Sequence, residues 1–282
     1  YVRCGALSEA KTVLESLPVR DVVTWSTLMS GYVHLGHPRE ALFFFEKMQR
    51  EGISPNPVTF TCSLKACATI GDIEKGKEIH ADIVDMGLLH KDIILGTALI
   101  DMYARFGFLT KAHQVFNDIQ NQDVVCWTSL IAGYVEHGYG EEALHCYKEM
   151  QVKKVVPDSV TILYGLKACS AIRSIEKGIE LHAEIARRSL LETNVVIGST
   201  LVDMYIKSGL LTKAKQVFDV LPIRDVVSWT TLIDGYTDHG YGEDALLCYE
   251  QMRLQGFVPN AVTFIGVLRA CSSVGAIEKG QE

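Results

Sequence analysis

The sequence predicts an all-α solenoid, a superhelix of stacked two-helix repeats, and three observations indicate it. The only three tryptophans, Trp25, Trp127 and Trp229, are each 102 residues from the next. The segments around them are nearly the same: DVVTWSTLMSGYV, DVVCWTSLIAGYV and DVVSWTTLIDGYT. Apolar residues within them recur at helical spacing. Helix hairpins that repeat in this way bury their apolar faces against neighbouring hairpins. The repeat alone leaves the handedness of the superhelix open.

The composition excludes several classes of protein. The 282 residues are 48% hydrophobic and 22% charged, which is typical of a globular chain and not of a disordered or collagen-like one. The net charge of −7 argues weakly against broad nonspecific nucleic-acid binding, because phosphate neutralisation needs clustered Lys and Arg. No apolar run is long enough to predict a membrane span. The eight cysteines lack CxxC spacing, so a reducing compartment is favoured. The chain starts at Tyr1 without an initiator Met or an apolar leader, and we expect it to be a fragment.

Internal similarity divides the 102-residue unit into segments of 35, 36 and 31 residues. Each kind of segment has its own recurring motif, such as LKAC and IEKG in the second kind and DMY in the third. We therefore predict complete repeats at 22–56, 57–92, 93–123, 124–158, 159–194, 195–225 and 226–260, with partial repeats at 1–21 and 261–282.

Each repeat is predicted to contain two helices. In 124–158, apolar residues from Trp127 to Val135 recur at i, i+3, i+4, i+7 and i+8, which indicates an amphipathic helix. Gly138 and Gly140 are predicted to break this helix before a second apolar stripe begins. Pro157 is predicted to prevent continuation of the second helix.

This pattern resembles the pentatricopeptide repeat family, in the plant form in which P, L and S repeats alternate. The motifs that carry the resemblance are VVxWxxLIxGY…EALxxYxxM…VPD/N, LKACA…IEKGxxxHA and ALIDMYARFG…AxxVF, for P, L and S repeats respectively. The partial repeats at 1–21 and 261–282 then belong to the S and L types. The resemblance covers nearly the whole chain. It implies sequence-specific binding of single-stranded RNA in mitochondria or chloroplasts, as the site-recognition part of a C-to-U editing factor.

The resemblance assigns a base-packing role to the second residue of each repeat. These residues are all β-branched and apolar, and therefore stiff enough to form a slot: Val23, Val58, Ile94, Val125, Val160, Val196 and Val227. The alternative is that they are ordinary core residues at the start of a helix.

In the family, the fifth and last residues of a repeat meet the Watson–Crick edge of one base. The fifth residues here are Ser26, Thr61, Thr97, Thr128, Leu163, Ser199 and Thr230. The last residues are Asn56, Asp92, Asp123, Asp158, Asn194, Asp225 and Asn260. Helix capping is the alternative, and it explains Asp or Asn before a helix well. It does not explain a hydroxyl one turn inside the helix, where Ser and Thr have no advantage.

The family rule pairs a hydroxyl and Asp with guanine, and a hydroxyl and Asn with adenine. A carboxylate suits the guanine N–H donors, and an amide suits the donor and acceptor of adenine. L repeats follow this rule less reliably, and Leu163 cannot form a side-chain hydrogen bond. With the N-terminus toward the RNA 5′ end, as in the family, the predicted site is A-N-G-G-N-G-A.

Phosphate contacts are predicted to be few. The family places a cation near position 13, where only Arg105 and Lys207 are secure cations here, so we expect weak binding by this chain alone. The resemblance further implies accessory editing factors docked on L repeats and a deaminase domain in cis or in trans.

No catalytic residue, metal site or cofactor is predicted, and the chain is not expected to be an enzyme. Cys67, Cys169 and Cys271 recur because the repeat recurs, and no zinc-deaminase motif of HxE with a later CxxC is present. His80 and His182 are expected to be packing or surface residues. The alternative function is a protein- or peptide-binding α-solenoid scaffold, which the acidic balance favours slightly.

Overall fold

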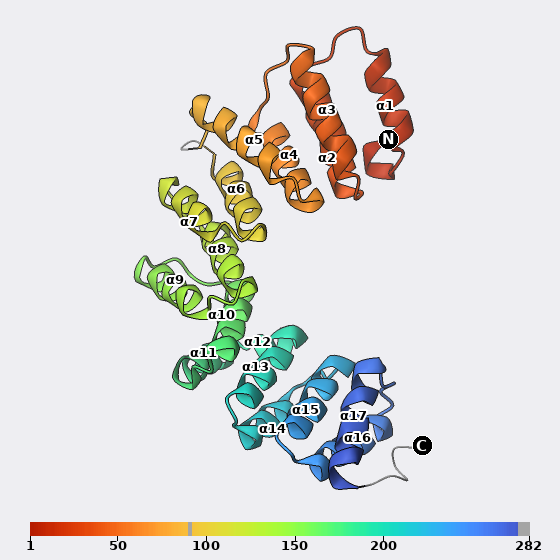
Figure 1. Cartoon of the computed structure of the whole chain (residues 1–282), viewed down its shortest axis with the longest axis vertical. Helices are drawn as coiled ribbons and strands as arrows, with labels where there is room; N and C mark the ends of the chain where they lie inside the picture. The colour runs from red at the N-terminus through yellow and green to blue at the C-terminus, as the bar shows by residue number, and fades with distance from the viewer. Residues whose placement is uncertain (90–91, 276–282) are drawn as a thin grey trace. The chain divides into compact units, whose positions relative to one another are not determined.

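The computed structural model describes residues 1–89 and 92–275, and every regular element in these residues is a helix (Figure 1). The predicted all-α fold of stacked two-helix repeats is therefore confirmed. Residues 276–282 of the predicted last repeat, and residues 90 and 91 of the 57–92 repeat, lie outside the described residues. None of the helices in the described part has the length and apolarity needed to cross a membrane.

The chain divides into two units, residues 1–137 and 138–282. In the first unit, the first helices of successive hairpins pack side by side as one layer, here called the first-helix layer. This layer contains α2 (Val22–His34), α4 (Pro57–Ile70), α6 (Ile93–Arg105) and α8 (Val124–Glu136). A second-helix layer packs on it and contains α3 (Pro38–Arg50), α5 (Ile73–Asp85) and α7 (Leu109–Asp118). A short 3₁₀ helix (Val2–Cys4) and α1 (Leu7–Ser16) pack against α2.

The second unit repeats this two-layer arrangement. Its first-helix layer contains α10 (Ser159–Ile172), α13 (Val195–Lys207), α15 (Val226–Asp238) and α17 (Ala261–Val274). Its second-helix layer contains α9 (Gly140–Val152), α11 (Ile175–Arg187), α14 (Leu211–Val220) and α16 (Gly242–Leu254). The 159–194 repeat has a third helix, the single turn α12 (Leu190–Thr193), which the two-helix prediction did not include. It follows Ser189, whose φ of 49° turns the chain out of α11.

The first helices begin where an Asp or Asn side chain accepts a backbone N–H of the first turn. The Thr24 N–H donates to the Asp21 side chain, for example, and the Asp21 backbone N–H donates to the Thr24 hydroxyl, which forms a capping box. Each first helix that follows such a residue, from α2 to α17, starts at the first residue of a predicted repeat, and Asp72 caps the second helix α5 in the same way. The assignment of the repeats to the P, L and S types stays a prediction.

The structure corrects the role of one glycine. Gly138 ends α8 in the left-handed region with φ of 81°, as predicted, but Gly140 is the first residue of α9 and not a breaker. A Cβ at Gly140 would lie 2.6 Å from Ile172 Cγ2 and 3.2 Å from the Ala168 carbonyl oxygen. Gly140 is therefore required because α9 starts in direct contact with α10.

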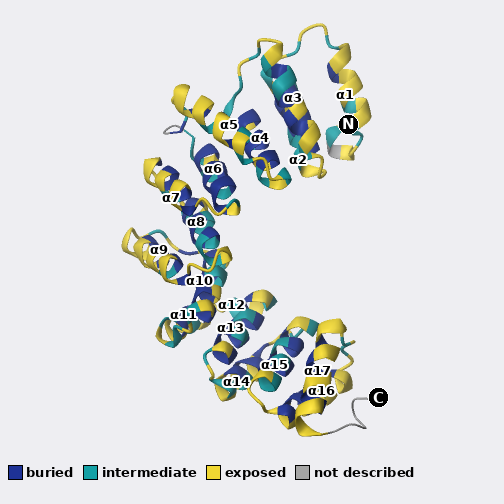
Figure 2. Cartoon of the chain, viewed as in Figure 1, coloured by how far each residue is buried: buried dark blue, intermediate teal, exposed yellow. Residues whose placement is uncertain are grey.

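The core lies between the two layers of each unit (Figure 2). The three tryptophans are buried, and two of them meet a phenylalanine of the preceding second helix edge to face. The ring centroids of Phe116 and Trp127 are 4.5 Å apart, and those of Phe218 and Trp229 are 4.6 Å apart. Truncating a buried aromatic of this size costs about 3–5 kcal/mol of unfolding free energy, so these contacts hold successive hairpins together.

Candidate functional site

In each unit, the second residues of the repeats form an exposed apolar column on the first helices. Their exposed fractions run from 45% at Val160 to 67% at Ile94, and the set is Val23, Val58, Ile94, Val125, Val160, Val196 and Val227. Side chains this exposed are not core residues, so the core alternative does not hold. Val262, the equivalent residue of α17, is 54% exposed and extends the column. Their contact with bases stays a prediction.

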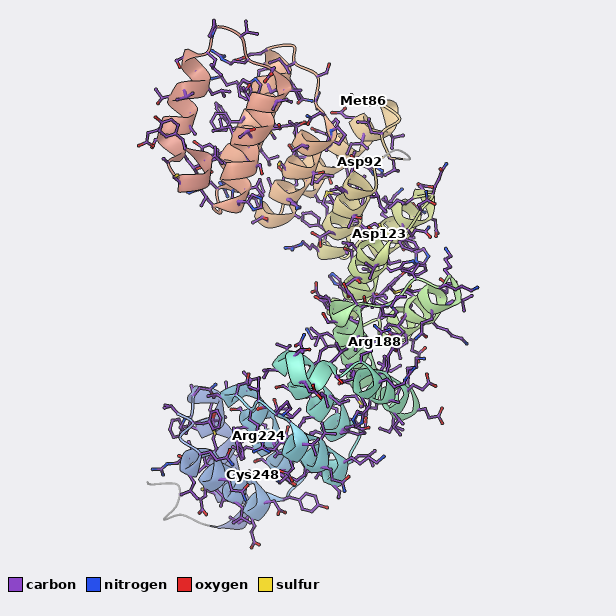
Figure 3. The ribbon with its side chains drawn as sticks, turned by 180° about the vertical axis from the view of Figure 1, so that it is seen from behind. Met86, Asp92, Asp123, Arg188, Arg224 and Cys248 are labelled. Carbon is purple, nitrogen blue, oxygen red and sulfur yellow. The ribbon has the colours of Figure 1, made fainter. Side chains whose placement is uncertain are left out.

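The last residues of the repeats all serve as N-caps of the following helix. Oδ1 of each accepts one or two backbone N–H groups; the Asn56 oxygen lies 2.9 Å from Thr59 N, and the Asp123 oxygen 2.9 Å from Cys126 N. The others are Asp92, Asp158, Asn194, Asp225 and Asn260. Figure 3 labels Asp92 and Asp123, where α6 and α8 begin. These residues therefore do cap helices, and the cap hydrogen bonds use one of the two polar atoms of each side chain.

The fifth residues lie at the seams between first helices and are less exposed than the second residues. Thr61, Thr97, Thr128 and Leu163 are half-buried, and Ser26, Ser199 and Thr230 are buried with 7% exposure. Four of the hydroxyls donate to a carbonyl of their own helix, at distances between 2.7 and 3.1 Å: Ser26, Thr97, Thr128 and Ser199.

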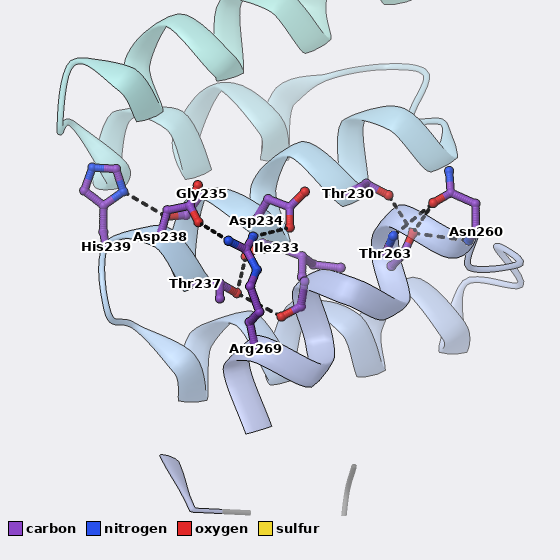
Figure 4. A network of polar contacts seen from close by, with 11 residues as sticks. Thr230, Ile233, Asp234, Gly235, Thr237, Asp238, His239, Asn260, Thr263 and Arg269 are labelled. Carbon is purple, nitrogen blue, oxygen red and sulfur yellow. Dashed lines mark hydrogen bonds and ion pairs between the residues drawn. The ribbon is translucent and has the colours of Figure 1, made fainter. Parts of the chain in front are cut away.

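Two predicted pairs of fifth and last residues are connected through one residue of the next helix. Thr263 donates to Asn260 Oδ1 at 3.0 Å, and Thr230 lies 2.7 Å from the Thr263 hydroxyl oxygen (Figure 4). In the first unit, Thr97 lies 3.0 Å from Cys126 Sγ, and the Cys126 N–H donates to Asp123.

Other predicted pairs are not linked in this way. No hydrogen bond joins Ser26 to Asn56, or Ser199 to Asp225, in the part of the chain that the structure describes. Leu163 has no polar side-chain atom with which to contact Asn194. Thr128 and Asp158 belong to different units.

One pocket brings together predicted residues from two successive repeats. It has a volume of about 200 Å³ and lies on the first-helix layer of the first unit. The second, fifth and last residues of the 57–92 repeat, Val58, Thr61 and Asp92, line it together with Ile94, the second residue of the next repeat. Two apolar walls and two polar side chains therefore meet at one opening, which is the chemistry that a planar polar ring requires.

The two predicted phosphate-contacting cations are each paired with an acid one turn earlier. Arg105 Nε lies 3.2 Å from Asp101 Oδ2, and Lys207 Nζ lies 2.9 Å from Asp203 Oδ2. Both cations are exposed and both aspartates are half-buried, so each ion pair contributes little to stability and is screened by salt. The pairs nevertheless cancel the positive charge that the sequence alone predicts at these positions.

In the second unit, another basic residue, Arg269, is neutralised by two aspartates (Figure 4). Arg269 of α17 contacts Asp238 Oδ1 at 2.8 Å and Asp234 Oδ1 at 3.1 Å, both on α15. Burial raises the pKa of Asp234, while Arg269 opposes that shift. Both aspartates line a pocket of about 540 Å³ that also contains Lys207 and Asp203.

The recurring cysteines and histidines are packing residues. Cys67 and Cys169 are fully buried, and burial raises the pKa of each thiol to about 12. No group of three or more His, Cys, Asp or Glu side chains in the described residues is arranged to hold a metal ion. His80 Nδ1 lies 2.8 Å from the Tyr103 hydroxyl, and His182 repeats this contact with Tyr205.

The sequence analysis did not predict two parts of the pocket around Thr61 and Asp92: the side formed by α2 and the lysine at its opening. Ser30, Val33 and His34 of α2 close one side, and Lys65 of α4 lies at the opening with the predicted residues. The sequence does carry a signal for Lys65, because a basic residue recurs at this place in every L repeat, as Lys167 and Arg269. The family pattern used for the prediction places a cation near position 13, and this second basic series lies outside it.

Comparisons with known proteins agree with this architecture. The family model described as "PPR repeat family" matches residues 20–69, 122–171 and 224–273, and the "PPR repeat" model matches 97–124 and 199–225. A chloroplastic pentatricopeptide repeat-containing protein of Arabidopsis thaliana is 34% identical over 99% of this chain and 34% of its own length. A mitochondrial one is 38% identical over 94% of this chain and 42% of its own length. The chain thus spans less than half the length of these relatives.

A solved structure gives the same fold. The crystal structure of the pentatricopeptide repeat protein PPR10 in complex with an 18-nt psaJ RNA element aligns with 99% of this chain and 42% of that chain. The TM-score is 0.56 and the sequence identity is 19%, so this likeness supports the fold alone.

Proposed function

The chain belongs to the pentatricopeptide repeat family, and from this premise we propose that it binds single-stranded RNA sequence-specifically, one base per repeat. The observation that carries the proposal is the pocket of α4 and α6, in which Val58 and Ile94 stand beside Thr61 and Asp92. Single-stranded RNA is recognised by stacking of unpaired bases and by hydrogen bonds to their edges, and this pocket offers both.

Capping defines which atoms the last residue offers to a base. With Oδ1 used by the helix N-terminus, an Asp offers its second oxygen, an acceptor, and an Asn offers its NH₂, a donor. A hydroxyl that donates to its own helix carbonyl keeps only acceptor capacity. Hydroxyl and Asp then match guanine N1–H and N2–H, while hydroxyl and Asn match adenine N6–H and N1. The caps thus support the predicted site A-N-G-G-N-G-A.

The test is a titration of the chain with labelled RNA carrying A-N-G-G-N-G-A, and with its pyrimidine complement. We expect measurable binding to the first only, and the Asn56→Asp variant should change the first preference from A to G. Asn and Asp are equally good N-caps, so the variant keeps the fold. Equal or undetectable binding to both RNAs would favour the peptide-binding scaffold instead.

We further propose that this RNA binding selects a cytidine for C-to-U editing in a chloroplast or mitochondrion. The alternation of 35-, 36- and 31-residue repeats supports this role, with the deaminase supplied in cis or in trans and accessory editing factors docked on the L repeats. Organellar transcripts from plants lacking the gene would test it. Loss of editing at cytidines on the 3′ side of A-N-G-G-N-G-A is expected, and unchanged editing at all such sites would contradict it.

A further inference from the structure

Lys65 occupies a distinctive place on the first-helix layer. It follows Val58 and Thr61 on α4 at the spacing i, i+3 and i+7, so the three side chains share one face of the helix. All three line the pocket that Asp92 and Ile94 complete. Lys65 is exposed, so its ammonium group stands at the solvent side of a site that contains apolar walls and base-matching polar atoms.

Lys65 is also unpaired, unlike the cations at position 13. No carboxylate of the described residues lies within ion-pair distance of Lys65, whereas Arg105 on the neighbouring helix is held by Asp101. An unpaired lysine can bind a phosphate without first breaking an ion pair to a carboxylate. The difference in pairing therefore makes Lys65 the stronger phosphate contact in the first unit.

The equivalent residue of the second complete L repeat shares these properties. Lys167 is exposed, its Nζ lies 5.0 Å from the ring centroid of Tyr164 on the same helix, and no described carboxylate pairs with it. Arg269, the third residue of this series, is clamped by Asp234 and Asp238. Two of the three cations are thus open to a ligand, and both belong to the complete L repeats.

We propose that Lys65 and Lys167 are the main RNA phosphate contacts of this chain. This inference rests on the proposed RNA binding and adds the residues that hold the backbone. In each set of successive P, L and S repeats, the L repeat then contributes affinity by binding a phosphate. The P and S repeats contribute most of the base specificity.

The experiment compares two double variants with equal charge change. Lys65→Gln/Lys167→Gln removes the proposed phosphate-binding lysines, and Lys75→Gln/Lys177→Gln removes two lysines of the second-helix layer from the same two repeats. Dissociation constants for the A-N-G-G-N-G-A RNA are measured across a salt series. Removal of each phosphate-binding lysine should weaken binding about fivefold at 0.1 M salt and reduce the salt slope by about 0.7.

Three outcomes are decisive. The proposal predicts a reduced slope for the first variant alone, an unchanged preference for A over G at the first base, and recovery of the slope in Lys65→Arg/Lys167→Arg. A parent-like slope in the first variant, or an equal loss in the second, would overturn the proposal while leaving RNA binding intact. Absence of RNA binding by the parent chain would overturn both this proposal and the proposed function.

Discussion

Arg173 adopts a left-handed backbone at the end of α10, with φ of 55°. The equivalent residues of the other L repeats are Gly71 and Gly275, with φ of 85° and 67°. A Cβ makes this conformation unfavourable, which is why glycine is preferred after a helix. The 159–194 repeat therefore carries local strain that its counterparts avoid.

Arg173→Gly should relieve this strain and raise the free energy of unfolding by about 1 kcal/mol. Urea denaturation at pH 7 measures the change, and Arg173→Gln, which loses the charge but keeps the Cβ, separates loss of the side-chain charge from relief of the backbone. Gly71→Ala is the matched opposite change and should destabilise the chain. Equal stability of Arg173→Gly and the parent would show that the left-handed turn is not strained.

The sequence predicts two roles for the last residue of each repeat, helix capping and base contact, and does not distinguish between them. Asp123 caps α8 through Oδ1, which leaves its second oxygen outside the cap hydrogen bonds. Because capping and base contact use different atoms of one carboxylate, the two roles are compatible. The composition of this column is consistent with both roles; the hydrogen bonds show the capping, and the base contact stays a prediction.

Successive elements are joined by a recurring polar contact between layers. His80 of α5 meets Tyr103 of α6, and His182 of α11 meets Tyr205 of α13, each with 2.8 Å between Nδ1 and the hydroxyl oxygen. Burial lowers the pKa of both histidines, and the nearby Lys111 and Lys213 lower it further. Asp118 acts in the opposite direction on His80.

These histidines should make the fold sensitive to acid. In the unfolded chain a histidine titrates near pH 6.5, whereas the folded pKa lies lower, so the unfolded state binds more protons as the pH falls. The contribution is complete above about pH 6.5 and is lost as the pH drops toward the folded pKa. Urea midpoints between pH 7 and pH 5 should fall less steeply in His80→Gln/His182→Gln than in the parent, and an identical dependence would contradict this account.

Element positions were predictable from the sequence, but the pairing of surface charges was not. Apolar spacing and the Asp or Asn caps place the first helices, since both signals are local. The partner of Arg105 depends on side-chain rotamers, and Gly140 depends on the approach of α10, so neither follows from helical periodicity. The single turn α12 arises from the backbone at Ser189, for which the sequence carries no turn signal.

Releasing the paired cations should strengthen RNA binding. Asp101→Asn/Asp203→Asn frees Arg105 and Lys207, and each freed cation should make the salt slope steeper by about 0.7. Asp82→Asn/Asp85→Asn on α5 gives the same change in net charge away from the first-helix layer. A parent-like slope in the Asp101→Asn/Asp203→Asn variant would show that position 13 does not contact phosphate.

At the scale of the whole molecule, an acidic chain is proposed to bind a polyanion. The net charge of −7 opposes that association at long range, but each phosphate interacts with a local surface. In the described residues, the first helices of each unit carry exposed apolar second residues, the capping Asp and Asn residues, and one unpaired lysine of an L repeat. Affinity is therefore expected to be modest and specificity to come from base contacts.

The most direct test exchanges two bases through their capping residues. The double variant Asn56→Asp/Asp123→Asn keeps net charge, composition and both N-caps, and it exchanges the proposed preferences of the first and third repeats. Dissociation constants are measured for both proteins with A-N-G-G-N-G-A and G-N-A-G-N-G-A. We expect the parent to prefer the first RNA and the double variant to prefer the second. The same order of affinity in both proteins would contradict recognition of one base per repeat.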